Sequence, residues 1–127
     1  MDYGNLKVLI VDDEPDIRTI GILSLTKLAG WTVLESSNGV EALALAREEL
    51  PDVILLDVMM PGMDGPTTLQ QLLADERTAK IPVIFCTAKV LRDEIDAYLR
   101  LGAAGVVSKP FDPISLPKEI KMVVDGI

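Results

Sequence analysis

Short hydrophobic runs alternate five times along the chain with longer segments that carry apolar residues at helical spacing. Runs of branched apolar residues without polar alternation are typical of strands buried on both faces of a sheet. The run Val53–Leu56 is the most hydrophobic and is predicted to be central, and the less apolar Thr32–Ser36 to lie nearer an edge. The predicted strands are Lys7–Val11, Thr32–Ser36, Val53–Leu56, Ile81–Cys86 and Gly105–Ser108.

The segments between these runs predict five helices, because their apolar residues recur every three or four positions. Pro15 suits the first turn of a helix that reaches about Leu28 and ends at Gly30. Asn38, with Glu41 three positions later, resembles a capping box in which Asn replaces Ser or Thr. The other apolar stripes are Leu43, Ala46 and Leu50, stopped by Pro51; Leu69, Leu72 and Leu73; Leu91, Ile95 and Leu99; and Leu116, Ile120, Val123 and Val124.

Five strands separated by helices predict an α/β fold with one parallel sheet, because strands joined through helices cannot form hairpins. Right-handed crossovers then place helices on both faces of the sheet. Five strands suit the flavodoxin-like order 2-1-3-4-5, whose crevice lies between the first and third strands. With 127 residues and no linker, repeat or low-complexity segment, the chain is predicted to be a single domain spanning 1–127 with no output domain attached.

Composition excludes several classes of function. The net charge of −8 and the pI near 4.4 disfavour direct nucleic-acid binding, which needs clusters of lysine and arginine. The chain has no histidine, so it cannot assemble a Ser–His–Asp or Cys–His device, and zinc is a poor match. The single Cys86 excludes an intrachain disulfide and favours a reducing, cytoplasmic setting. No signal peptide or apolar stretch of about 20 residues is present, so no membrane association is expected.

Polar side chains suited to phosphate chemistry stand at the carboxyl ends of four predicted strands. Asp12 and Asp13 follow the first strand and Asp57 follows the third. Thr87 follows the fourth strand, and Lys109 closes the fifth. Open parallel sheets bind ligands at this edge, so the five side chains are expected to converge there.

Three carboxylates placed together repel one another, by ~1 kcal/mol per pair in water and ~4 kcal/mol near a protein surface at about 4 Å. A divalent cation with oxygen ligands, such as Mg²⁺, relieves this repulsion. One oxygen of Asp57 would then remain to attack a phosphoryl donor, and Thr87 and Lys109 could hold the other phosphoryl oxygens. Taken singly, Asp12 or Asp13 reads as a helix N-cap, Thr87 as a turn hydroxyl and Lys109 as a solvated lysine. Their joint placement favours the functional interpretation.

The sequence resembles the receiver domain of two-component response regulators, of the chemotaxis-regulator type. The resemblance covers nearly the whole chain, in order and at compatible spacing. The matching stretches are VLIVDDEP at 8–15, NGVEAL at 38–43, PDVILLDVMMPGMDG at 51–65, IPVIFCTAK at 81–89 and GAAGVVSKPFDP at 102–113.

This resemblance implies a role for each candidate residue. Asp57 matches the aspartate that a sensor histidine kinase or phosphotransfer protein phosphorylates. The pair Asp12 and Asp13, together with Asp57, matches the acidic residues that hold Mg²⁺ (Mn²⁺ could substitute), with the backbone carbonyl of Met59 as a further ligand. The hydroxyl and ammonium that contact the phosphoryl group match Thr87 and Lys109. A cis peptide bond before Pro110 is also implied.

The implied function is a phosphorylation switch that binds or releases a downstream protein target. The chain is not expected to be an enzyme beyond its own phosphorylation and autodephosphorylation at Asp57. It is expected to be a monomer or a weak dimer. Both a free-standing receiver and a fragment of a larger regulator are compatible with this sequence.

One position departs from the family pattern. Receivers commonly carry Tyr or Phe three residues before the lysine, and this chain has Val106. A stiff, small valine cannot swing between buried and exposed rotamers. Activation is therefore predicted to depend more on repositioning of the segment 88–95, with Thr87 as the trigger.

Two rival functions stay open. A haloacid-dehalogenase-type phosphatase also attacks through an Asp at a strand end, but a second Asp is then usual where Met59 stands. A degenerate receiver that acts as a constitutive binding module would usually lack the acceptor or the acidic pair, and both are present here.

Overall fold

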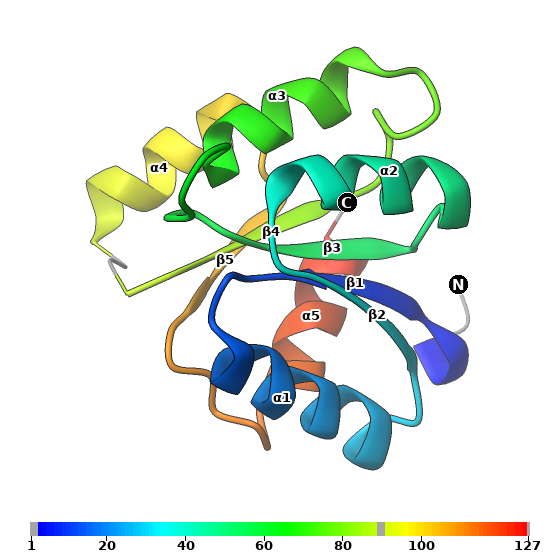
Figure 1. The fold of residues 1–127 in the computed structure, drawn as a ribbon. Helices are drawn as coiled ribbons and strands as arrows, with labels where there is room; N and C mark the ends of the chain where they lie inside the picture. Colours follow the sequence, from blue (N-terminus) through cyan, green and yellow to red (C-terminus); the bar gives the residue numbers. More distant parts are fainter. Residues whose placement is uncertain (1–2, 89–90, 127) are drawn as a thin grey trace.

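The structure, a computed structural model, describes residues 3–88 and 91–126 and contains the five predicted strand–helix pairs (Figure 1). The strands are β1 (Lys7–Val11), β2 (Thr32–Ser36), β3 (Val53–Asp57), β4 (Val83–Thr87) and β5 (Gly105–Ser108). The helices are α1 (Pro15–Leu23), continued by the π-helical η2 (Ser24–Leu28), α2 (Gly39–Glu49), α3 (Gly65–Ala74), α4 (Arg92–Leu101) and α5 (Leu116–Asp125), with a 3₁₀ turn η1 (Tyr3–Asn5) before β1.

The sheet confirms the predicted topology. All neighbouring strands are parallel, and their order is β2-β1-β3-β4-β5. Strands β1 and β3 lie side by side although α1, β2 and α2 separate them in the sequence. This arrangement is the flavodoxin-like fold, and it brings the carboxyl ends of β1 and β3 together.

Helices cover both faces of the sheet: α1 and α5 lie on one face, and α2, α3 and α4 lie on the other (Figure 1). Alternate residues of β1 supply the two cores. Val8 and Ile10 pack with the α1 and α5 side, and Leu9 and Val11 pack with the α2 and α3 side. Because the central strands are buried on both faces, they read as continuous hydrophobic runs in the sequence.

Several boundaries differ slightly from the predictions. The strand β3 includes Asp57, and β4 spans Val83–Thr87 instead of beginning at Ile81. The Ile81 amide donates to the carbonyl of Thr78 in a turn, which delays the start of the strand. Asn38 caps α2 as predicted, since its Oδ1 accepts a hydrogen bond of 2.8 Å from the Glu41 amide.

The buried face of α4 was predicted wrongly. The pattern pointed to a stripe of Leu91, Ile95 and Leu99, but Leu91 precedes the helix and both leucines are exposed. The half-buried residues of α4 are Glu94, Ile95 and Tyr98. A hydrophobic pattern cannot distinguish an apolar stripe that covers a sheet from one that faces solvent.

None of the helices within residues 3–88 and 91–126 combines the length and the apolar content needed to cross a bilayer.

Candidate functional site

The predicted site residues occupy the carboxyl ends of four adjacent elements of the sheet. Asp12 directly follows β1, and Asp57 is the last residue of β3. Thr87 is the last residue of β4, and Lys109 directly follows β5. The parallel registers carry these four positions to the same edge, as the sequence predicted.

Four carboxylates gather at this edge. Asp12, Asp13, Glu14 and Asp57 each offer one oxygen, and these oxygens all lie within 4.8 Å of one another. Asp12 and Asp57 are almost fully buried, with 2% and 3% of their surface exposed. Glu14 was not among the site residues predicted from the sequence, although its position directly after the acidic pair was an available signal.

Lys109 balances much of this negative charge. Its Nζ lies 3.0 Å from Asp12 Oδ2, 3.3 Å from Asp57 Oδ1 and 3.3 Å from Glu14 Oε1. Burial acts to lower the pKa of Lys109, but the hydrogen bond to Asp12 and the charges of Asp12 and Asp57 outweigh it and raise that pKa. The ammonium is therefore a permanent positive charge at the site.

The carboxylate of Asp57 remains incompletely compensated. Burial, followed by the charge of Asp12, raises its pKa from 3.8 to about 6, against the opposing effects of Lys109 and the Met59 amide. Oδ1 accepts a hydrogen bond of 3.3 Å from the Met59 amide and lies beside Lys109. Oδ2 is buried and has no hydrogen-bond partner among the described residues.

Asp12 is held by the start of α1 as well as by Lys109. Its Oδ1 accepts a hydrogen bond of 2.9 Å from the Glu14 amide, which closes a local turn before the helix. The N-cap of α1 is Glu14, so the alternative that Asp12 or Asp13 caps this helix was wrong. Arg18 Nη1 donates to the Asp12 carbonyl oxygen over 2.7 Å, and Arg18 Nε pairs with Glu35 on β2 over 3.0 Å. These contacts fix the Asp12 backbone between α1 and β2.

Thr87 and the loop of Lys109 lie next to the acceptor. Thr87 is buried, with 5% of its surface exposed, and its carbonyl oxygen accepts a hydrogen bond of 3.0 Å from the Lys109 amide. The peptide bond between Lys109 and Pro110 is cis, as the resemblance implied. The side chain of Met59 is 77% exposed, and its backbone amide donates a hydrogen bond of 3.3 Å to Asp57 Oδ1.

A cavity of about 340 Å³ opens over the acceptor. The residues that line it come from the ends of β3, β4 and β5, from the start of α1 and from α4; they are Glu14, Asp57, Val58, Met59, Thr87, Ala88, Tyr98 and Lys109. Three of these, Asp57, Thr87 and Lys109, were predicted from the sequence as reacting or phosphoryl-contacting residues. Tyr98 was not predicted, because it belongs to a helix and lies 41 positions after Asp57.

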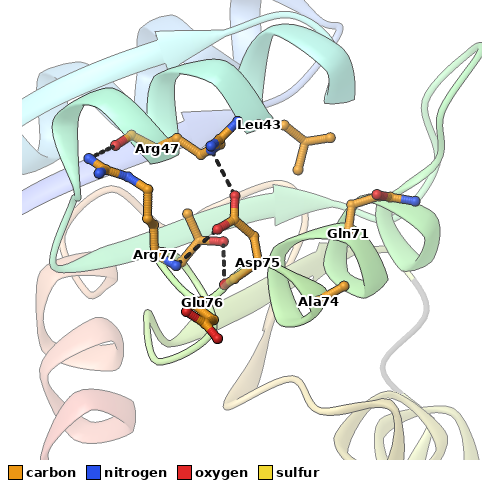
Figure 2. Close-up of a pocket in the computed structure, with 8 residues that line it drawn as sticks. Leu43, Arg47, Gln71, Ala74, Asp75, Glu76 and Arg77 are labelled. Carbon is orange, nitrogen blue, oxygen red and sulfur yellow. Dashed lines mark hydrogen bonds and ion pairs between the residues drawn. The ribbon is translucent and has the colours of Figure 1, made fainter.

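A larger hollow, of about 570 Å³, lies between the carboxyl ends of α2 and α3 (Figure 2). Arg47 Nε pairs with Asp75 Oδ2 over 2.8 Å, and Arg77 Nη2 donates to the Arg47 carbonyl oxygen over 3.0 Å. Asp75 Oδ1 also accepts a hydrogen bond from the Arg77 amide. These charged groups pair with one another and link α2 to the segment that follows α3. The hollow does not include the predicted site residues at the strand ends.

The donor set at the strand ends fits a magnesium ion. Mg²⁺ prefers oxygen ligands and commonly takes only one or two carboxylates while it keeps several waters. Asp12, Asp13 and Asp57 offer carboxylate oxygens that lie within 4.8 Å of one another. The Met59 carbonyl as a further ligand stays a prediction. A cation at this cluster would relieve the repulsion that raises the pKa of Asp57.

Val106 lies on β5 directly opposite Phe85 of β4. It is half-buried and packs in the same core as Tyr98. The predicted movement of the segment 88–95 in response to Thr87 stays a prediction, and residues 89 and 90 of that segment lie outside the described residues.

Comparison with known proteins identifies the family. The family model of the response regulator receiver domain matches residues 8–121. Protein PilH of Pseudomonas aeruginosa is 38% identical over 120 residues, which cover 94% of this chain and 98% of PilH. The phosphate regulon transcriptional regulatory protein PhoB of the same species is 40% identical over 117 residues, which cover 92% of this chain and 51% of PhoB.

Solved structures agree with the sequence relatives. The chemotaxis response regulator CheY4 of Vibrio cholerae superimposes with a TM-score of 0.86 at 31% identity, covering 93% of this chain and 98% of CheY4. A response regulator structure from Chloroflexus aurantiacus also gives a TM-score of 0.86, at 30% identity and with 95% of this chain covered. The fold, the strand-end residues and these relatives together lead to one conclusion: the chain belongs to the response regulator receiver domain family of two-component signalling.

Proposed function

We propose that the chain is a phosphorylation switch in which Asp57 accepts a phosphoryl group from a phosphohistidine of a sensor histidine kinase or phosphotransfer protein. Asp12, Asp13, Asp57 and the Met59 carbonyl would hold the Mg²⁺ ion that assists this reaction, and Mn²⁺ could replace it. The observation that carries the proposal is the buried Oδ2 of Asp57, which has no hydrogen-bond partner among the described residues and belongs to a carboxylate that lines a cavity.

The two oxygens of Asp57 are suited to different tasks. Oδ1 is oriented by the Met59 amide and by Lys109, which keeps the carboxylate in place. Oδ2 is left to attack phosphorus: a bond forms between Oδ2 and phosphorus while the bond between phosphorus and the histidine nitrogen breaks. The departing imidazole keeps the electron pair and takes up a proton from water. No general base is needed, because a carboxylate whose pKa is about 6 is mostly deprotonated at pH 7.

Lys109 and Thr87 stabilise the transferred group. The ammonium lies 3.3 Å from Asp57 Oδ1 and can donate a charge-assisted hydrogen bond to a phosphoryl oxygen. Thr87 lines the same cavity and offers a hydroxyl to another phosphoryl oxygen. When bound, Mg²⁺ supplies positive charge that neutralises the transferring phosphoryl oxygens.

Phosphorylation biases a two-state equilibrium of the chain, and a downstream protein target binds one state more tightly than the other. The relatives include full-length regulators such as PhoB, of which this chain spans about half, so the target can be another protein or a further domain. The acidic chain is not proposed to bind nucleic acid directly. We do not propose any enzymatic turnover beyond the phosphorylation and dephosphorylation of Asp57.

Intact-mass analysis after treatment with acetyl phosphate tests the acceptor role. Wild-type protein with Mg²⁺ is expected to carry a single labile phosphoryl adduct. Asp57→Asn with Mg²⁺, and wild type with a chelator, are expected to carry none. An adduct on Asp57→Asn would contradict the assignment of the acceptor.

The same preparation separates the rival functions. Steady release of phosphate from a small phosphomonoester by the wild type, abolished by Asp57→Asn, would favour a phosphatase of the haloacid dehalogenase type. Failure of the wild type to take up phosphate from acetyl phosphate with Mg²⁺ would favour a binding module that works without phosphorylation.

A further inference from the structure

The residues of helix α4 are less deeply buried than those of the other α-helices. Each of the other four α-helices has at least one buried residue, and α4 has none among its described residues. Its inner face consists of the half-buried Glu94, Ile95 and Tyr98, whose spacing places them on one side of the helix. An element with few buried contacts is the kind that can change position at low cost.

One of these inner residues, Glu94, has a buried oxygen whose hydrogen-bonding capacity is not satisfied within the described part of the chain. Glu94 Oε2 is buried and has no hydrogen-bond partner among the described residues. A buried carboxylate oxygen without a partner disfavours the arrangement that contains it. In the resting arrangement, Glu94 therefore weakens the docking of α4.

Tyr98 provides the main specific contact of the inner face. Its ring packs edge-to-face against Phe85 of β4, with 5.1 Å between centroids and 67° between planes. Phe85 is fully buried and lies two residues before Thr87 on the same strand. The opposite residue on β5 is the small Val106, so the aromatic group at this place comes from the helix.

Tyr98 also reaches the acceptor site. It is the residue of α4 that lines the cavity over Asp57, together with Thr87, Ala88 and Lys109. One side chain thus belongs both to the wall of the phosphoryl cavity and to the contact between α4 and β4.

We propose that Tyr98 is a positioning residue that couples the phosphoryl site to helix α4: a phosphoryl group on Asp57 displaces the ring from its place beside Phe85 and the cavity, and α4 shifts with it. This inference rests on the proposed acceptor role of Asp57. The ring carries the coupling, since its contact with Phe85 holds the helix, and the phenol hydroxyl is dispensable.

Hydrogen exchange of α4, measured by mass spectrometry on the peptide containing residues 92–101, tests the coupling. Each protein is measured with Mg²⁺ alone and with Mg²⁺ and acetyl phosphate, and intact mass is recorded in parallel to quantify the adduct. In the wild type, phosphorylation is expected to change the rate of amide hydrogen exchange in α4 by about 5-fold or more. A factor of about 5 is the lower end of the usual range for allosteric coupling. Tyr98→Phe is expected to behave as the wild type.

Tyr98→Leu is expected to acquire the adduct but to lose most of the phosphorylation-dependent change in α4. Tyr98→Met is made alongside it, because a flexible side chain fills a similar volume without an aromatic ring and keeps α4 docked in the resting state. Leu99→Ala is the matched control: this exposed neighbour on α4 does not line the cavity, so the change should persist.

The outcomes distinguish the inference from the proposed function. If phosphorylated Tyr98→Leu and Tyr98→Met keep the full exchange difference, Tyr98 does not couple the site to α4, whereas the acceptor role stands. If Leu99→Ala abolishes the difference as Tyr98→Leu does, the effect is a general weakening of α4 and the coupling role is excluded. If the wild type takes up no phosphate, the proposed function fails and this inference fails with it.

Discussion

At the scale of single residues, Asp57 gives this molecule its most distinctive electrostatic property. Its pKa is about 6 in the folded chain, above the ordinary value of 3.8 for this side chain, so the folded state binds this proton more tightly than the unfolded state does. The raised pKa therefore favours folding below about pH 4, and that contribution is lost as the pH rises through 6. At neutral pH and without metal, the ionised carboxylate of Asp57 therefore destabilises the folded state.

Asp57→Asn should remove this destabilisation. In buffer with a chelator, the variant is expected to be more stable than the wild type at pH 7.5, and the difference should shrink toward pH 4. Each pKa unit corresponds to about 1.4 kcal/mol, and solvent screening at a site open to a cavity leaves an expected gain of about 1–2 kcal/mol. Urea unfolding at several pH values measures it, and a gain independent of pH would show that the charge of Asp57 is not the cause.

Lys109 stabilises the folded state, because its positive charge compensates the carboxylates of the same cluster. Its side chain is 13% exposed and lies within 3.3 Å of oxygens of Asp12 and Asp57. Lys109→Met in metal-free buffer is expected to lower the free energy of unfolding by about 2–4 kcal/mol, because removal of one partner leaves buried carboxylates uncompensated.

The double variant Lys109→Met/Asp57→Asn is the control for this interpretation. It should lose less stability than Lys109→Met alone, since asparagine needs no counter-ion. Strictly additive effects of the two substitutions, measured by urea unfolding, would show that the two charges do not interact.

At the scale of elements, the start of α3 packs directly against the strand that carries Asp57. A Cβ added at Gly65 would lie 2.5 Å from the Asp57 carbonyl oxygen and 2.8 Å from Val58 Cα. Backbone atoms cannot yield as a flexible side chain can. Gly65→Ala is therefore expected to lower the free energy of unfolding by about 1–3 kcal/mol and to slow the phosphorylation of Asp57 by acetyl phosphate.

Gly62→Ala serves as the comparison for Gly65→Ala. Gly62 adopts φ +78°, but a Cβ there would meet nothing within 4 Å. Its substitution should cost stability through backbone strain alone and leave the phosphorylation rate of the folded protein unchanged. Equal slowing by both substitutions would mean that loss of stability, and not displacement of β3, limits the reaction.

Some elements of the fold and the site could be predicted from the sequence, and others could not. The buried strands, their order and the convergence of Asp12, Asp57, Thr87 and Lys109 followed from continuous apolar runs with polar ends. The inner face of α4 did not follow, because Leu91 and Leu99 outweigh Tyr98 in any hydrophobic pattern and yet face solvent. Likewise, the contact of Glu14 with Lys109 spans 95 positions, and nothing in the local pattern of either residue specifies it.

At the scale of the whole molecule, the acidic cluster joins the stability of the fold to the binding of a cation. A ligand that binds only the folded state stabilises it, by about 1.4 kcal/mol when its concentration is ten times its dissociation constant. For a chain of this size, such a gain raises the melting temperature by roughly 4 °C. Mg²⁺ is therefore expected to raise the melting temperature of the wild type at pH 7.5, measured by calorimetry or circular dichroism.

The pH dependence of that increase is the sharper prediction. Below pH 6 the proton on Asp57 competes with the cation, so the stabilisation by a fixed concentration of Mg²⁺ should be smaller at pH 5 than at pH 7.5. Asp13→Asn removes a carboxylate of the cluster without touching the ion pairs of Lys109, and should reduce the effect of Mg²⁺ at both pH values. An equal rise in melting temperature for the wild type and Asp13→Asn would place the cation elsewhere on this acidic surface. The stabilisation of the fold by Mg²⁺ would then not arise from the site proposed at the strand ends.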